Sequence, residues 1–109
     1  MLDERGGPNH VQNFCFAPIH ADTQFDKLIL TPTYYYIGHF SKFIKPGAVL
    51  LSSSTSRTTI ESTTFKNENG TIVTVVMNPN DEKITYKLIV GDIESTIEIE
   101  PRAIQTLIY

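Results

Sequence analysis

The sequence holds a single cysteine, Cys15, among its 109 residues, so an internal disulfide is excluded. Charge is also limited: charged residues make up 19% of the chain, and the formal net charge is −3. This acidity argues against a nucleic-acid-binding surface, which needs clustered lysine and arginine. Long runs of like charge, which favour disorder, do not occur.

Long apolar stretches are missing as well. No run approaches the roughly 18–20 apolar residues of a membrane span, and residues 1–10 lack the apolar segment of a secretory signal. The chain does have 40% hydrophobic residues, enough for a core. Its length therefore predicts one domain, or part of a larger one.

A helix over Thr31–Ile44 is the clearest local prediction. Thr31 suits the cap position, and proline at position 32 suits the first helical position, where its missing N–H would have no partner. Pro46 and Gly47 then end the segment. Apolar residues recur at helical spacing on one face, which needs a large apolar partner surface: Tyr36, Ile37, Phe40, Phe43 and Ile44.

From residue 48 the hydrophobic period changes to two, which predicts six short strands. The central candidate is almost wholly apolar and β-branched, so we expect it to be covered on both faces, and the next alternates cleanly. An Asn69-Gly70 hairpin turn precedes the central candidate. Strands at this spacing predict a thin antiparallel sandwich, open to a further strand from a longer protein. The expected ranges are Ala48–Ser52, Thr59–Lys66, Thr71–Met77, Lys83–Val90, Ser95–Glu100 and Ala103–Tyr109.

Four stretches resemble the C-terminal end of glycoside hydrolase family 30, which comprises glucosylceramidases and related β-glycanases. They are GGPNHVQNFCFAPIHAD, TPTYYYIGHFSKFIKPGA, TIVTVVMNPND and AIQTLIY. The first two are the most specific, all four occur in the family's order, and the resemblance runs from about Leu2 to Tyr109. In that family a (β/α)8 barrel carries the chemistry beside a β-sandwich domain.

The resemblance implies a mainly β fold: an antiparallel immunoglobulin-like β-sandwich with one α-helix, truncated from a (β/α)8-barrel-plus-sandwich enzyme. Residues 1–46 would be the remnant of the barrel, with Leu2–Leu30 as the loop after its eighth strand and Thr31–Ile44 as its eighth helix. Residues 47–109 would be the sandwich, to which the family's N-terminus adds one or two strands. The chain would begin in a loop because the preceding barrel is absent.

The resemblance also implies a function for the longer parent, a glucosylceramidase-like O-glycosyl hydrolase. Retaining β-glucosidases use two carboxylates about 5–5.5 Å apart, and the family places both on barrel strands outside these residues. We therefore assign no catalytic residue here and expect the isolated chain to be inactive. Its partners would be the catalytic barrel of the same polypeptide and, in the intact enzyme, a β-glucoside.

Two further expectations concern how the chain interacts. The alternative function is a free-standing carbohydrate-binding or protein-interaction sandwich. An exposed helix or sheet edge would permit self-association.

The resemblance places Asn13, Phe14 and Cys15 at the rim of the substrate pocket in the intact enzyme. Asn13 would fix the loop or a sugar hydroxyl, and Phe14 would form an apolar wall. The competing interpretation is that Asn13 caps a turn and that Phe14 and Phe16 both belong to a core. Phe16 departs from the acidic or small residue that many members carry, so the shape of this rim stays open.

Other polar residues give weaker indications. The histidines at positions 10, 20 and 39 share no metal-ligand spacing and one cysteine cannot complete a zinc site, so we expect no metal or cofactor. His39 is expected to be a hydrogen-bonded structural residue. Asn69-Gly70-Thr71 matches the acceptor pattern for N-glycosylation, although the turn explains the same residues. Three glutamates are expected to face solvent: Glu61, Glu98 and Glu100.

Overall fold

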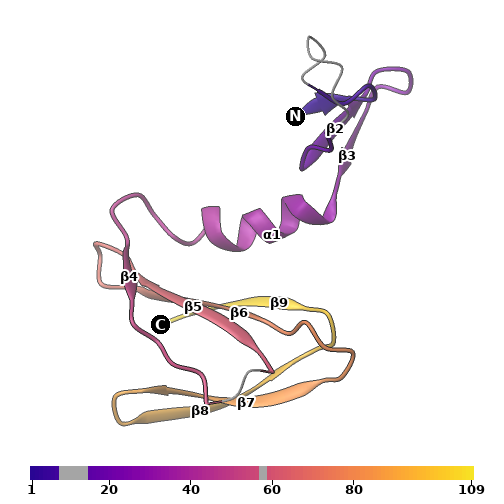
Figure 1. Ribbon diagram of the computed structural model, residues 1–109. Helices are drawn as coiled ribbons and strands as arrows, with labels where there is room; N and C mark the ends of the chain where they lie inside the picture. Colours follow the sequence, from indigo (N-terminus) through magenta and orange to yellow (C-terminus); the bar gives the residue numbers. More distant parts are fainter. Residues whose placement is uncertain (8–14, 57–58) are drawn as a thin grey trace. The chain divides into compact units, whose positions relative to one another are not determined.

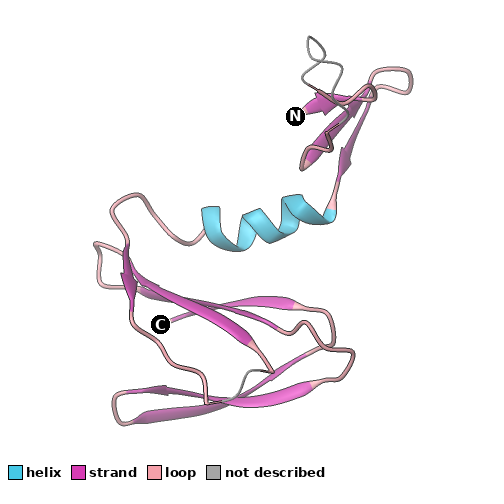
Figure 2. Ribbon diagram, viewed as in Figure 1, coloured by secondary structure: helices cyan, strands magenta, loops and turns pink. Residues whose placement is uncertain are grey.

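A computed structural model describes residues 1–7, 15–56 and 59–109 (Figure 1). The chain divides into two compact units, Met1–Gly38 and His39–Tyr109. Strands dominate both units, and the described part holds one helix, α1 (Pro32–Ser41), which crosses the boundary between them (Figure 2). No helix of the described part is long and apolar enough to cross a bilayer.

The first unit contains a small sheet of order β1-β2-β3, formed by Leu2–Asp3, Ile19–Asp22 and Lys27–Leu30. β1 runs parallel to β2, and β2 pairs antiparallel with β3. The expectation of a loop throughout Leu2–Leu30 is therefore wrong for the described part of that range. These strands are only two to four residues long, too short for a periodic pattern to stand out.

The turn between β2 and β3 also escaped sequence analysis because it contains neither glycine nor proline. The Asp22 side chain closes it: Oδ1 accepts the backbone N–H of Gln24 at 3.2 Å and of Phe25 at 3.1 Å. Asp26 then adopts a φ of 50°, a left-handed conformation that aspartate tolerates better than most residues. Asp22 and Asp26 thus form a tight turn of a kind that a glycine in the sequence would usually indicate.

The predicted helix is confirmed, but α1 ends at Ser41, three residues before Ile44. A bond from the Ile44 N–H to the Phe40 carbonyl, at 2.9 Å, continues the helical pattern into the turn that follows. At the other end, the Thr31 hydroxyl does not act as the predicted cap. It donates to the Pro18 carbonyl at 3.1 Å, while the Thr31 N–H donates to the same oxygen at 3.0 Å. Thr31 therefore ties the start of the helix to the segment before β2.

The apolar face predicted for this helix is only partly covered, with Phe43 and Ile44 half-buried and the other three residues exposed. No residue of α1 is buried. Tyr36 and Phe40 are each 40% exposed, and Ile37 is 48% exposed. The chain as described thus presents a row of large apolar side chains to solvent, which is costly unless another surface covers them.

The second unit is a two-layer sandwich, with the layers seen edge-on in Figure 1. One sheet has the order β4-β5-β6-β9, all neighbours antiparallel, and the other is the β7-β8 hairpin. All six predicted strands are confirmed, with starts within two residues of the expected ones. Their bounds are β4 Val49–Leu51, β5 Glu61–Lys66, β6 Ile72–Met77, β7 Ile84–Val90, β8 Ile93–Ile99 and β9 Ile104–Ile108.

The core of the sandwich centres on β6. Its four consecutive residues 73–76 are all buried, and Val73 and Val76 are each 1% exposed. Because successive side chains of a strand point to opposite faces, β6 is covered on both, as its sequence predicted. β7 alternates between half-buried and exposed positions. Ile99 of β8, which pairs with Ile84 of β7, is 1% exposed.

The predicted Asn69-Gly70 turn does join β5 to β6. Only Gly70 of the pair uses a positive φ, at 89°. The Gly70 N–H donates to the Asn67 carbonyl and the Asn67 N–H donates to the Thr71 carbonyl, each at 2.9 Å. This is the pattern of a turn followed by a left-handed bulge residue, not of a two-residue loop with both central φ values positive.

A buried asparagine anchors the loops at one end of the sandwich. The Asn78 side chain is fully buried, and its Nδ2 donates to the carbonyls of Glu82 at 2.7 Å and Glu100 at 3.0 Å. Its Oδ1 accepts the backbone N–H of Asn80 at 3.0 Å. One side chain thus joins the β6–β7 connection to the end of β8.

Replacing Asn78 with alanine should lower the free energy of unfolding by about 1–3 kcal/mol, because the hydrogen bonds of a fully buried amide are lost. Urea denaturation followed by circular dichroism measures this change. The exposed Asn69→Asp serves as the control and should shift stability by no more than about 0.5 kcal/mol. Equal stabilities for the wild type and Asn78→Ala would show that water replaces the amide at no cost.

Candidate functional site

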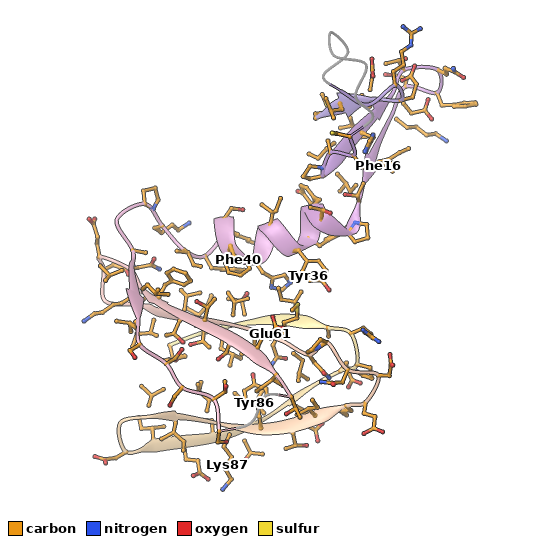
Figure 3. All side chains as sticks on the ribbon, viewed as in Figure 1. Phe16, Tyr36, Phe40, Glu61, Tyr86 and Lys87 are labelled. Atoms are coloured by element: carbon orange, nitrogen blue, oxygen red, sulfur yellow. The ribbon has the colours of Figure 1, made fainter. Side chains whose placement is uncertain are left out.

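The predicted pocket-rim residues are only partly visible in the structure. Asn13 and Phe14 lie outside the described residues, and Cys15 is exposed. Just after them, Phe16 is 78% exposed, so the alternative that placed it in a core is wrong. Its ring meets the His20 ring edge-on, with centroids 5.3 Å apart. This side chain is labelled in Figure 3.

Both described histidines hold backbone or side-chain partners. His20 is buried on β2, and its Nε2 accepts the N–H of Ala17 at 3.0 Å. His39 Nδ1 is hydrogen bonded to the Thr106 hydroxyl at 2.9 Å, which confirms the structural role predicted for it. Within the described ranges, no group of three or more potential ligands could hold a metal ion.

The Glu4 carboxylate of the first unit is held by two hydrogen bonds from Thr23. Its Oε1 accepts the Thr23 hydroxyl at 2.7 Å, and its Oε2 accepts the Thr23 backbone N–H at 3.3 Å. The hydroxyl bond, followed by backbone hydrogen bonds, lowers the pKa of Glu4 below the ordinary glutamate value. A carboxylate held ionised in this way is poorly suited to donate a proton as a general acid. Glu4 also borders a hollow of about 220 Å³ lined with Phe16, His20 and Ile29.

The carboxylates of the second unit form exposed ion pairs. Lys83 lies 2.8 Å from Glu98 and 3.0 Å from Glu100, and Lys87 lies 2.6 Å from Glu94. Lys83 precedes β7 and pairs with Glu98 of β8 and with Glu100 just after it, whereas the Lys87–Glu94 pair joins β7 to β8. Glu98 and Glu100 are exposed, which confirms their predicted outward position. Glu61, the third glutamate of that prediction, is also exposed. Such pairs stabilise a surface weakly and are no sign of acid–base chemistry.

A cavity of about 940 Å³ lies along β7 in the second unit. Every residue of that strand, Ile84–Val90, lines it, together with the loop residues 51–56 and hydroxyl-bearing residues of β5 and β6. Because inward and outward residues of β7 both reach the cavity, the cavity follows an edge of the strand as well as its inner face. β7 pairs with β8, so among the described residues this edge of the sandwich is open.

Hydroxyl groups line the inner wall of this cavity. Thr74 is hydrogen bonded to Thr64 at 3.0 Å and to the Tyr109 hydroxyl at 2.8 Å. Tyr86 points from β7 into the space between the layers, whereas Lys87 points away from it (Figure 3). The Tyr86 hydroxyl accepts a hydrogen bond from Gln105 Nε2 of β9, and burial raises its pKa. The sequence did not predict this cluster of hydroxyl groups, because threonine in a strand indicates only a preference for β structure.

Comparison with known proteins assigns both parts of the chain. Residues 47–107 match the glycosyl hydrolase family 30 β-sandwich domain, and residues 1–44 match the family's TIM-barrel domain. The chain therefore belongs to glycoside hydrolase family 30, and its fold is that of the family's C-terminal β-sandwich with the end of the barrel domain.

Two relatives and one crystal structure illustrate the similarity. Putative glucosylceramidase 2 of Caenorhabditis elegans is 36% identical over 98% of this chain, and the lysosomal acid glucosylceramidase of Mus musculus is 37% identical over 76%. SrfJ from Salmonella typhimurium is 36% identical and superposes over 99% of the chain with a TM-score of 0.93. The chain spans only 22%, 16% and 24% of their respective lengths.

Removing the Thr23 hydroxyl tests the geometry around Glu4. In Thr23→Val the pKa of Glu4 should rise towards the ordinary glutamate value, whereas Thr23→Ser should leave it lowered. Since the folded-state pKa is depressed, the bond stabilises the fold above the unfolded pKa and is lost as the pH falls through the folded one. Carboxyl-detected NMR titration measures this pKa, and an unchanged value in Thr23→Val would contradict the assigned cause.

Proposed function

We propose that this chain is the C-terminal part of a retaining β-glucosidase of the glucosylceramidase kind, in which it supports the catalytic barrel. Residues 1–46 would belong to the barrel and residues 47–109 to the sandwich. The names of the matched relatives support the substrate class, since those proteins are glucosylceramidases. The two reacting carboxylates would come from the remainder of the longer polypeptide, about 5–5.5 Å apart as retention requires.

The exposed apolar face of α1 is the main observation that supports this proposed role. Burial of a large apolar side chain is worth about 1.5–3 kcal/mol, and this face leaves Tyr36, Ile37 and Phe40 each at least 40% exposed. In a (β/α)8 barrel the helices form an outer ring that packs against the strands. A barrel that covers this face would gain stability from several such side chains at once.

The open edge of β7 supports the same role for the sandwich. Unpaired N–H and C=O groups along a strand edge accept another strand readily. The cavity of about 940 Å³ extends along all seven residues of β7. A strand from elsewhere in the longer polypeptide would close it, which agrees with the sequence-based expectation of a sandwich that takes strands from the N-terminus.

We also propose that Asn13, Phe14 and Cys15 contribute to the rim of the substrate pocket in the longer enzyme. The loop after the last barrel strand opens at the C-terminal face of the barrel, where active sites of this fold lie. Asn13 would hold the loop or a sugar hydroxyl and Phe14 would form an apolar wall. Cys15 is exposed in this chain, as a rim position requires.

The purified chain should not hydrolyse an aryl β-glucoside, because it lacks both reacting carboxylates. With a nitrophenyl β-glucoside as substrate, release of nitrophenol by the chain is compared with a protein-free blank and with the longer enzyme that includes the barrel. Turnover by the chain above the blank would overturn the assignment of the chemistry to the missing barrel. No turnover by the longer enzyme would overturn the β-glucosidase proposal itself.

A carbohydrate-binding module is the second candidate, favoured only by the hydroxyl-lined cavity along β7. Isothermal titration of the chain with glucosyl oligosaccharides separates the two functions. Affinity tighter than about 1 mM, or roughly −4 kcal/mol, would favour the module. Absence of heat, combined with activity of the longer enzyme, would favour the supporting role.

The exposed helix face should make the isolated chain self-associate. Sedimentation velocity of the wild type should show a sedimentation coefficient that rises with concentration, and Phe40→Ser should reduce this rise. In the longer enzyme the same substitution should destabilise instead, because a buried aromatic replaced by a small polar residue leaves a cavity. A chain that stays monomeric, together with an unchanged longer enzyme, would show that nothing needs this face.

A further inference from the structure

We propose that Asn69, at the tip of the β5–β6 hairpin, is an acceptor for an N-linked oligosaccharide. The inference does not depend on the proposed function, since it uses only the geometry of this hairpin. Asn69, Gly70 and Thr71 form an N-x-T triplet whose middle residue is not proline, the pattern that such acceptors require. Sequence alone leaves the triplet explained by the turn, so the structure has to distinguish the two.

The Asn69 side chain is exposed and already oriented. Its Oδ1 accepts the backbone N–H of Thr71 at 3.0 Å, so one end of the amide is fixed by the third residue of its own triplet. Among the described residues, Asn69 Nδ2 donates to no protein acceptor. The atom that would carry the sugar is therefore available on the outside of the turn.

The other described asparagines differ from Asn69 on this point. Asn67 Nδ2 donates to the Phe43 carbonyl, Asn78 Nδ2 donates to two carbonyls, and Asn80 Nδ2 donates to the Thr59 carbonyl. Asn67 and Asn78 are also buried. The turn thus uses both polar atoms of the Asn67 amide but only the oxygen of Asn69, which leaves Asn69 Nδ2 outside.

The hairpin tip also has room for a bulky group. Glu68, Asn69 and Gly70 are all exposed, and a Cβ placed on Gly70 would have no atom within 4 Å. The core residues of β6 begin only at Val73, beyond the turn. An oligosaccharide on Asn69 would therefore extend into solvent without displacing a core side chain.

The reaction needs a glycosyl donor that the chain does not hold: an oligosaccharide linked through its anomeric carbon to a polyprenyl pyrophosphate, presented by a membrane-bound transferase. Asn69 Nδ2 forms a bond to that anomeric carbon while the bond from the carbon to the pyrophosphate oxygen breaks. The polyprenyl pyrophosphate leaves with the electron pair, and Nδ2 loses one proton to a base. The transferase recognises the triplet through the Thr71 hydroxyl.

Translation of the full chain with an added secretory leader, in the presence of microsomes, tests the proposal. A second copy carries a known acceptor triplet at its end, which reports entry into the lumen. The protease-protected wild-type chain should gain the mass of a single core oligosaccharide, and a peptide:N-glycosidase should remove it. A protected wild-type chain without that gain, beside a modified reporter copy, would overturn the proposal.

Matched variants locate the site. Asn69→Asp keeps the oxygen that accepts the Thr71 N–H but removes Nδ2, so its hairpin should fold while the mass gain is lost. Thr71→Val should lose the gain as well, and Thr71→Ser should keep it. Retention of the full gain in Asn69→Asp would assign the oligosaccharide elsewhere and overturn the inference.

Discussion

The structure of the second unit depends on the burial of both faces of β6. Residues 73–76 of this strand are buried without a break, so each face needs its own cover. β5 and β9 satisfy its backbone groups on either side, while the β7-β8 layer covers one face. Turns of fixed geometry then have to return the chain at the right register, which explains why buried asparagines and positive-φ residues gather at the strand ends.

The same requirement explains what the chain leaves uncovered. Val73 is covered almost completely within these 109 residues, whereas Tyr36 and Phe40 of α1 each stay 40% exposed. The cavity along β7 is the corresponding gap in the sandwich. Both features are what a segment built to pack against more polypeptide would show, and they agree with the small share of its relatives that the chain spans.

The elements that sequence analysis predicted well are those with a long period or a distinct end signal. An apolar, β-branched run predicted β6, and regular alternation of apolar and polar residues predicted β7. Pro32 indicated the start of the helix. The β2–β3 hairpin was missed because its strands have four residues each and its turn relies on Asp22 and Asp26. Periodicity needs more than four residues, and an aspartate turn carries no signal distinct from a polar surface.

The candidate site was less accessible to prediction than the fold. Its proposed rim residues came from resemblance, since Asn13 and Phe14 have no pattern that defines a role. The partner of Glu4 lies 19 residues away, and the hydroxyl pair of Thr64 and Thr74 joins two strands. Contacts of this kind depend on strand register, and the predicted Asn69-Gly70 turn does not by itself define which residues of the two strands face each other.

Asn67 shows how closely the connection after α1 is tied to the sandwich. Its Oδ1 accepts the Lys45 N–H and its Nδ2 donates to the Phe43 carbonyl, each at 3.0 Å. The stretch before Pro46 is thus bonded to a hairpin more than 20 residues later, and the compact unit begins at His39. A chimera that joins this sandwich to another family member's barrel should therefore be spliced ahead of Phe43. Asn67 and its two backbone partners then come from the same parent protein.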